Sequence, residues 1–192
     1  ITCGLLGLRT GARNLLIANP RDLPQTIKTL KPHRLHVFPG VNTLFNGLLN
    51  QPAFATLDFS ELVISNGGGT AVQEAVATRW LQTTGCPIVE GYGLSETCSG
   101  VTCNPADSLA LTGTVGLPLP NVSIRIIDDE GRSVASGTSG EIAIKGPQVM
   151  AGYWQRADET ALVMTDDGYF KTGDIGTMDE RGYIRIVDRK KD

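Results

Sequence analysis

The sequence lacks a long apolar run and has few cysteines and few aromatic residues. No stretch approaches the ~20 apolar residues that span a bilayer, which argues against a transmembrane role. The four cysteines form neither a C-x-x-C pair nor a zinc pattern with the two histidines. The first residues do not have the order of charged and apolar residues that is typical of a secretory signal. We therefore expect reduced cysteines in a cytoplasmic protein.

A basic surface is also missing. The 17 lysines and arginines are scattered along the chain except for the run at 189–191, and the formal net charge is -3. A nucleic-acid binder concentrates positive charge on one face, so we do not expect nucleic acid as a partner.

The chain has no initiator methionine, because it begins with Ile1. It ends at Asp192, directly after three basic residues and without a terminal tail. We expect both ends to lie inside a longer protein that carries further catalytic groups.

The residues that are present have an ordinary globular composition, with 41% hydrophobic and 19% charged residues. In the first half, short β-rich apolar runs alternate with helical patterns. Buried strands are expected at 35–38, 62–65 and 88–90, and helices at 41–49 and 70–81. This alternation predicts an α/β fold built on a sheet.

A glycine triplet, Gly67-Gly68-Gly69, precedes the second of these helices. Thr70 and Gln73 have the spacing of a capping box, which predicts a helix start at Thr70. The triplet would then form a strand-to-helix turn whose backbone N–H groups point outward, toward a ligand. Packing alone would explain the glycines about as well.

After Gly113 the pattern changes to alternating strands and tight turns. Strands are expected at 122–126, 141–145 and 183–186, and a helix at 157–164. We interpret this half as a small β-barrel or sandwich and expect Trp154 to pack within it.

An octet in the first half carries most of the predicted chemistry, and it reads Glu90-Gly91-Tyr92-Gly93-Leu94-Ser95-Glu96-Thr97. Two glycines flank Tyr92 directly after a predicted strand, so a planar ligand such as adenine could stack on its ring. The Ser95 hydroxyl can donate to a phosphate oxygen, and the Glu96 carboxylate is the type of ligand that Mg²⁺ prefers. The alternative is a glycine turn with a solvated glutamate.

Further along, Asp174 follows a glycine that allows a sharp bend. Its ionised carboxylate can accept two hydrogen bonds from a ribose 2′,3′-diol. Thr-Gly-Asp is also a common turn sequence, so the tripeptide alone favours an ordinary turn over a site.

Taken in order, the octet, the segment 169–174 and the final run 188–192 resemble the adenylate-forming superfamily. Within this superfamily, the sequences of segments 40–46, 146–150 and 152–154 are similar to those of bacterial long-chain fatty acyl-CoA synthetases. The family usually has threonine where this chain has Ser95, which keeps the hydroxyl. The resemblance implies part of a large N-terminal domain, with an α/β subdomain at 1–113, a small distorted β-barrel at 114–188 and a hinge at 189–192 to a C-terminal domain.

The same resemblance implies a site for ATP or AMP. Asp174 and Arg189 would hold the ribose, and Ser95 and Glu96 would act at the phosphates, with Glu96 as the Mg²⁺ ligand. The remaining nucleotide contacts would come from Gly67, Gly68, Gly69, Glu90, Gly91, Tyr92 and Gly93. Lys191 would be the hinge about which the C-terminal domain rotates.

Three apolar residues, Val41, Phe45 and Leu94, are candidates for the lining of an acyl tunnel. Apolar residues at helical spacing more often form ordinary core, so this assignment rests on the resemblance.

The implied reaction is a two-step ligation. A long-chain fatty acid and ATP would give an acyl-adenylate and pyrophosphate, and the thiol of coenzyme A would then displace AMP. The resemblance also implies peripheral association with the inner membrane and a homodimer of the full-length protein. The family's phosphate loop and catalytic lysine lie outside this sequence, so we expect the chain alone to be inactive.

Two alternatives remain open at this point. One is another adenylate-forming branch, such as an aryl-CoA ligase or a peptide-synthetase adenylation domain. The other is a non-catalytic module that keeps the fold for nucleotide binding.

Overall fold

The computed structural model describes residues 2–107 and 112–190, and the chain forms two compact units. Unit 1 comprises residues 1–91 and 105–111, and unit 2 comprises residues 92–104 and 112–192. The boundary falls within strand β3 (Ile88–Leu94), so the octet contributes residues to both units.

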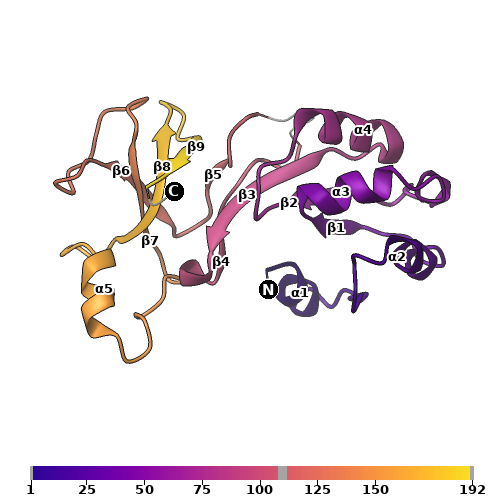
Figure 1. Ribbon diagram of the computed structural model, residues 1–192, viewed down its shortest axis with the longest axis horizontal. Helices are drawn as coiled ribbons and strands as arrows, with labels where there is room; N and C mark the ends of the chain where they lie inside the picture. The colour runs from indigo at the N-terminus through magenta and orange to yellow at the C-terminus, as the bar shows by residue number, and fades with distance from the viewer. Residues whose placement is uncertain (1, 108–111, 191–192) are drawn as a thin grey trace. The chain divides into compact units, whose positions relative to one another are not determined.

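Unit 1 is built on parallel strands with helical connections, as the alternating pattern predicts (Figure 1). The first residues of β3 pair with β2, and β2 pairs with β1, both in parallel. Parallel neighbours need crossover connections, and the helices supply them. The elements in chain order are α1 (Thr2–Arg9), α2 (Leu23–Leu30), β1 (Val37–Gly40), α3 (Asn42–Leu49), the 3₁₀ turn η1 (Phe54–Thr56), β2 (Ile64–Gly67) and α4 (Glu74–Thr84).

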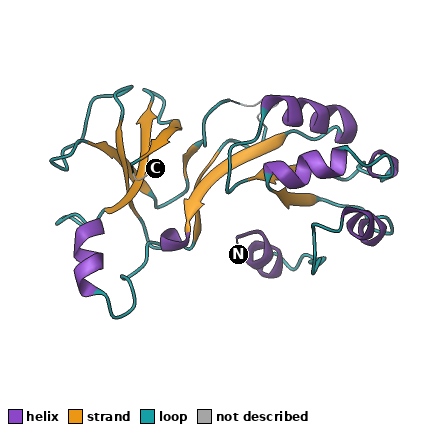
Figure 2. Ribbon diagram, in the orientation of Figure 1, coloured by secondary structure: helices purple, strands orange, loops and turns teal. Residues whose placement is uncertain are grey.

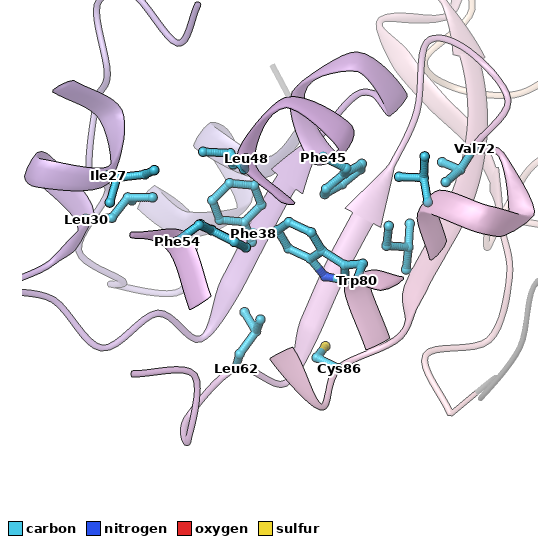
Figure 3. Packing of buried hydrophobic residues seen from close by; sticks show 12 residues of the cluster. Ile27, Leu30, Phe38, Phe45, Leu48, Phe54, Leu62, Val72, Trp80 and Cys86 are labelled. Carbon is cyan, nitrogen blue, oxygen red and sulfur yellow. The ribbon is translucent and has the colours of Figure 1, made fainter. Parts of the chain in front are cut away.

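The core of unit 1 is centred on Trp80 of α4, which is fully buried (Figure 3). Its ring lies 4.7 Å from that of Phe45 in an edge-on arrangement and 5.3 Å from that of Phe38, measured between centroids. The indole Nε1–H donates to the buried Ser65 Oγ at 2.9 Å, so the only polar atom of the side chain is satisfied. This packing fixes α3 and α4 against the sheet.

The expected start of α4 is wrong. The helix begins at Glu74 instead of Thr70, and its N-cap Gln73 makes no side-chain capping bond. Gln73 has an extended backbone (φ −69°, ψ 136°), so the helix cannot include the residues before it. The Val72 N–H donates to Glu90 Oε1 and the Gln73 N–H donates to Asn42 Oδ1, and these bonds hold the extended segment against neighbouring elements.

Unit 2 consists mainly of strands, with α5 (Ala157–Val163) as the α-helix among its described residues (Figure 2). Strands β6 (Ser123–Ile127), β7 (Gly140–Lys145), β8 (Phe170–Met178) and β9 (Ile184–Arg189) form an antiparallel sheet in that order. Its remaining elements are the 3₁₀ turn η2 (Ser95–Thr97), β4 (Ser99–Cys103) and β5 (Leu117–Pro118). The core contains Val101, Ile124, Ile126, Ile142, Ile144 and Ile184.

The antiparallel sheet confirms the strand-and-turn character that was predicted for the second half. Among the described residues, β6 and β9 are the outer strands of this sheet, and the order of pairing shows a sheet without showing a closed barrel. Trp154 corrects another expectation, because its side chain is 87% exposed instead of packed.

Within residues 2–107 and 112–190, none of the helices combines the length and the apolar character that crossing a bilayer requires.

Candidate functional site

The glycine-flanked tyrosine of the octet lies in a strand, not in a turn. Strand β3 continues through Gly91, Tyr92 and Gly93 to Leu94, and the turn follows at η2. A Cβ atom on Gly93 would lie 1.6 Å from the carbonyl oxygen of Ser99. Glycine is therefore needed here for the close approach of two backbone segments, and not for its own φ angle.

The turn at η2 is closed by a residue that the sequence analysis did not single out. Thr97 is fully buried, and its Oγ1 accepts from the Leu94 N–H at 3.0 Å and donates to the Ser99 carbonyl at 2.9 Å. Cys98 and Ser99 follow with φ angles of +51° and +106°, which non-glycine residues rarely adopt. Such strain persists only where the surroundings hold it, and it often accompanies functional sites.

The turn leaves Ser95 exposed and Glu96 half-buried. Glu96 is held from two sides by the segment that ends at Tyr153. The Met150 N–H donates to the Glu96 carbonyl at 2.7 Å, and the Tyr153 hydroxyl donates to Glu96 Oε1 at 3.1 Å. Partial burial raises the pKa of the Tyr153 hydroxyl, and the neighbouring Glu96 carboxylate raises it further, so Tyr153 remains a donor.

A second contact joins the octet to the segment 169–174. The Tyr92 hydroxyl donates to Asp174 Oδ2 at 2.5 Å, across 82 residues of chain. Burial is the main cause that raises the pKa of Tyr92, and the hydrogen bond to Asp174 adds to it. The phenol therefore stays protonated and the carboxylate has a permanent donor.

Arg189 reaches the other oxygen of the same carboxylate. Asp174 and Arg189 face each other across β8 and β9, and the guanidinium Nε lies 3.7 Å from Asp174 Oδ1. The Asp174 side chain is 11% exposed, whereas that of Arg189 is 59% exposed. A buried carboxylate is thus paired with a cation that remains accessible to solvent.

An irregularity in β8 gives Asp174 its position. The register between β7 and β8 shifts between Glu141 and Ala143, and Gly173 has a φ of +77°. Thr172 Oγ1 donates to the Ile142 carbonyl at 2.8 Å and accepts from the Asp174 N–H at 3.0 Å. Bulges of this kind redirect a side chain that would otherwise follow the pleat.

The same irregularity is anchored to the end of β9. Glu141 Oε1 accepts from the Gly173 N–H at 2.9 Å, and its Oε2 lies 3.3 Å from the ammonium of Lys190. That ammonium also contacts Asp129 Oδ1 at 2.9 Å, and the Lys190 N–H donates to the Gly173 carbonyl at 2.7 Å. The predicted hinge residue, Lys191, lies outside the described residues.

The other predicted nucleotide contacts lie in unit 1. Gly67 is opposite Glu90 in the sheet, and Glu90 Oε1 accepts from the Val72 N–H at 2.8 Å. Burial raises the pKa of the Glu90 carboxyl. A Cβ on Gly67 would crowd Val72 at 2.8 Å, whereas a Cβ on Gly68 would meet only the Gly91 carbonyl, at 3.7 Å. Close packing therefore explains why position 67 is a glycine. Position 68 has more open space around it.

The three apolar candidates have different surroundings. Phe45 is fully buried in the core of unit 1. Val41 is 41% exposed, and its Cγ1 would lie 3.7 Å from a Cβ on Gly69. Leu94, in unit 2, packs against the core of that unit and is partly buried.

The comparison with known proteins agrees with these motifs. A sequence profile described as AMP-binding enzyme matches residues 1–154. The chain belongs to this family. A long-chain-fatty-acid–CoA ligase of Yersinia pestis is 52% identical over 188 residues, which cover 98% of this chain and 33% of that relative. The chain therefore spans about a third of the length of the curated relative.

Solved structures of this AMP-binding family match the fold. ATP-bound MatB of Rhodopseudomonas palustris is 35% identical with a TM-score of 0.80, covering 89% of this chain and 34% of that one. A benzoate CoA ligase of Burkholderia xenovorans LB400 is 27% identical with a TM-score of 0.84, covering 97% of this chain and 38% of that one. The mixed α/β architecture thus matches part of the adenylate-forming enzymes.

For a member of this family, the donors and acceptors in unit 2 form two separate groups. One group is the Asp174 carboxylate between a phenol and a guanidinium, an arrangement suited to accepting hydrogen bonds from hydroxyls. The other is the exposed Ser95 hydroxyl beside the Glu96 carboxylate. No group of three or more histidine, cysteine, aspartate or glutamate side chains that could hold a metal ion occurs within the described part of the chain.

Proposed function

We propose that the full-length protein is an ATP-dependent long-chain fatty acid:CoA ligase and that this chain supplies part of its nucleotide and acyl sites. The contact network of Tyr92, Asp174 and Arg189 carries the nucleotide part of the proposal. The 52% identity to a long-chain-fatty-acid–CoA ligase supports the choice of acid. The proposal extends to the substrates of the whole protein, namely a long-chain fatty acid, ATP and coenzyme A.

In this proposal Asp174 and Arg189 hold the ribose. The buried carboxylate would accept hydrogen bonds from the ribose hydroxyls, and the exposed guanidinium would supply a charged donor fork that lysine could not reproduce. The ring of Tyr92 would stack on the adenine. The backbone around this base would come from Gly67, Gly68, Gly69, Glu90, Gly91 and Gly93.

Ser95 and Glu96 would act at the phosphates. The Ser95 hydroxyl is exposed on its turn and would donate to a phosphate oxygen. Tyr153 occupies Glu96 Oε1, and a carboxylate has a second oxygen with which to bind a cation. One carboxylate plus phosphate oxygens is a common set of ligands for Mg²⁺, so the residues fit this metal. Bound there, Mg²⁺ would neutralise phosphate charge as the carboxylate substrate approaches.

The reaction follows from these roles. In the first step a carboxylate oxygen of the acid would attack the α-phosphorus of ATP, and the bond to the β-phosphate oxygen would break to release pyrophosphate. In the second step the sulfur of coenzyme A, losing its proton, would attack the acyl carbon and release AMP. This chain's residues would hold the nucleotide in place for both steps, which contributes through positioning and electrostatic stabilisation.

In the proposed acyl site, Val41, Leu94 and Phe45 have different parts. Val41, exposed and adjacent to Gly69, would border the acyl chain near the glycine triplet. Leu94 would do so from the octet, and Phe45 would support the wall from the core.

The proposal also includes the larger organisation of the protein. Residues 1–113 and 114–188 would be subdomains of the large domain, with the sheet β6 to β9 as part of a distorted barrel. Lys191 would be the hinge to the C-terminal domain. The full-length protein would be cytoplasmic and peripheral to the inner membrane, and would form a homodimer.

The decisive experiment is acid-dependent pyrophosphate exchange by the full-length protein with ATP and Mg²⁺. The panel of acids would contain octanoate, palmitate, oleate, benzoate and amino acids, and Asp174→Ala would be tested in parallel. We expect exchange to be greatest with the long acids and to be lost in the variant. Exchange only with benzoate or an amino acid would assign the protein to another branch, and no exchange despite AMP binding would favour a non-catalytic module.

The 192-residue chain provides a further control. Because the phosphate loop and the catalytic lysine of the family lie outside it, we expect no exchange above the blank. Activity of the chain alone would contradict this assignment of the missing groups.

A further inference from the structure

The Tyr92 hydroxyl is not needed for stacking, because a phenylalanine ring would stack equally well on a base. In this structure the hydroxyl instead donates to Asp174 Oδ2 at 2.5 Å. The contact joins β3 to β8, two strands that are not neighbours in either sheet. The hydroxyl therefore has a role that the stacking of Tyr92 does not explain.

That role follows from the freedom of the aspartate side chain. The torsion at the end of an aspartate is broad and roughly two-fold, so a carboxylate with a single partner can turn. Here Tyr92 holds Oδ2, and Arg189 lies 3.7 Å from Oδ1. The hydrogen bond to Oδ2 and the positive charge near Oδ1 act on opposite oxygens, and together they restrict rotation of the carboxylate.

The carboxylate keeps capacity to accept further bonds. Its two oxygens offer about four acceptor positions. The phenol takes one of these, and the 3.7 Å separation from Arg189 is an ion pair longer than a normal hydrogen bond. Positions therefore remain for the hydroxyls of a sugar, in an orientation that is already set.

We propose that Tyr92 is a positioning residue whose hydroxyl orients Asp174 for the ribose and so sets the preference for ribonucleotides over deoxyribonucleotides. This inference rests on the proposed function, in which Asp174 accepts the ribose hydroxyls. Tyr92 then has two roles. Its ring contacts the base, and its hydroxyl acts on the sugar through Asp174. Base and ribose recognition are thereby coupled through one side chain.

The test compares Tyr92→Phe with the wild-type full-length protein. Pyrophosphate exchange is measured with ATP, 2′-deoxy-ATP and 3′-deoxy-ATP, and the discrimination is the ratio of kcat/KM for ATP to that for each deoxy analogue. A hydrogen bond to a charged group is worth about tenfold or more in affinity, so we expect the discrimination to fall about tenfold in Tyr92→Phe. The change should appear mainly in the KM for ATP. A general loss of structure would instead lower activity with all three nucleotides by the same factor.

Tyr169→Phe is the matched control. Its hydroxyl also makes a hydrogen bond in unit 2, 2.8 Å from Ser123 Oγ, but does not contact Asp174. We expect this variant to keep the wild-type discrimination. An unchanged discrimination in Tyr92→Phe, with the protein folded by circular dichroism, would overturn the inference.

Calorimetric binding of AMP and 2′-deoxy-AMP separates this inference from the proposed function. If the wild type shows no exchange but prefers AMP, and Tyr92→Phe loses that preference, the inference stands and the ligase proposal fails. If the wild type binds both nucleotides equally, or neither, the role of Asp174 fails and the inference fails with it.

Discussion

The Glu90 carboxylate accepts the backbone N–H of Val72 at 2.8 Å, and this bond ties β3 to the segment before α4. Burial raises the pKa of the Glu90 carboxyl. Because the folded state then binds this proton more tightly than the unfolded chain, the contribution of Glu90 to stability is fully present below the ordinary glutamate pKa of about 4.3. It declines as the pH rises through the folded pKa.

We therefore predict a pH-dependent effect of Glu90→Gln, which keeps an acceptor for Val72 but cannot ionise. The melting temperature of the variant relative to wild type should rise between pH 4 and pH 7. A flat difference for Glu90→Gln across this range would show that its burial does not control stability.

Trp80 and Ser65 give a prediction about the core of unit 1. Ser65→Ala removes the acceptor and leaves the indole N–H buried without it, which should destabilise the protein by about 1–3 kcal/mol. Trp80→Phe loses volume in a close-packed site, and with Ser65→Ala it should show less than the sum of the single effects. Denaturant unfolding of the single and double variants measures this, and strict additivity would mean that the bond contributes nothing.

Two glycines of the predicted site should respond differently to alanine. In Gly93→Ala the new Cβ meets the Ser99 backbone, and we expect a loss of more than about 3 kcal/mol or failure to fold. Gly173→Ala has open space around the new atom but keeps a φ of +77°, so about 1–2 kcal/mol is expected. Soluble yield and unfolding free energy distinguish the two, and equal effects would refute the clash at Gly93.

Tyr153 gives a prediction about the proposed metal residue. Partners that hydrogen-bond a metal ligand typically contribute 10- to 100-fold in metal affinity. Tyr153→Phe removes the donor to Glu96 Oε1, so we expect about tenfold more Mg²⁺ for half-maximal exchange in the full-length protein. Mn²⁺ binding followed by electron paramagnetic resonance, with ATP present, gives a second readout.

The neighbouring Trp154 is a useful control for this experiment. Its side chain is 87% exposed, so Trp154→Phe should leave the Mg²⁺ requirement unchanged. Equal shifts in both variants would mean that the loop, and not the Tyr153 hydroxyl, is responsible.

Local patterns in the sequence predicted most elements of the fold. The helix expected at 157–164 is found at Ala157–Val163, and the one expected at 41–49 is found at Asn42–Leu49. In α3 the helical spacing coincides with a buried face that contains Phe45 and Leu48, whereas α5 forms without a buried residue. The start of α4 was missed because Gln73 is extended, in a segment held by hydrogen bonds to side chains on other elements, which no local pattern reveals.

In the candidate site, too, local patterns identified the residues but not the contacts between them. The motifs identified Tyr92, Asp174 and Arg189 separately, but their meeting depends on pairing across the sheet and on a bulge at Gly173. Thr97 and Tyr153 were missed because their roles are hydrogen bonds to a turn. A threonine that completes a short turn sequence was the only local sign of the first, and the second had none.

The attachment of Lys190 to Gly173 has a mechanical consequence. Asp174 and Arg189 are the last pair of the β8–β9 ladder, directly before the residue whose N–H bonds Gly173. A pulling force applied to the chain after Lys190 would separate the pairs of this ladder one after another, beginning at that end. The pair that contains Asp174 would then be the first to separate, so such a force would act on the carboxylate before it reached any other pair of the ladder.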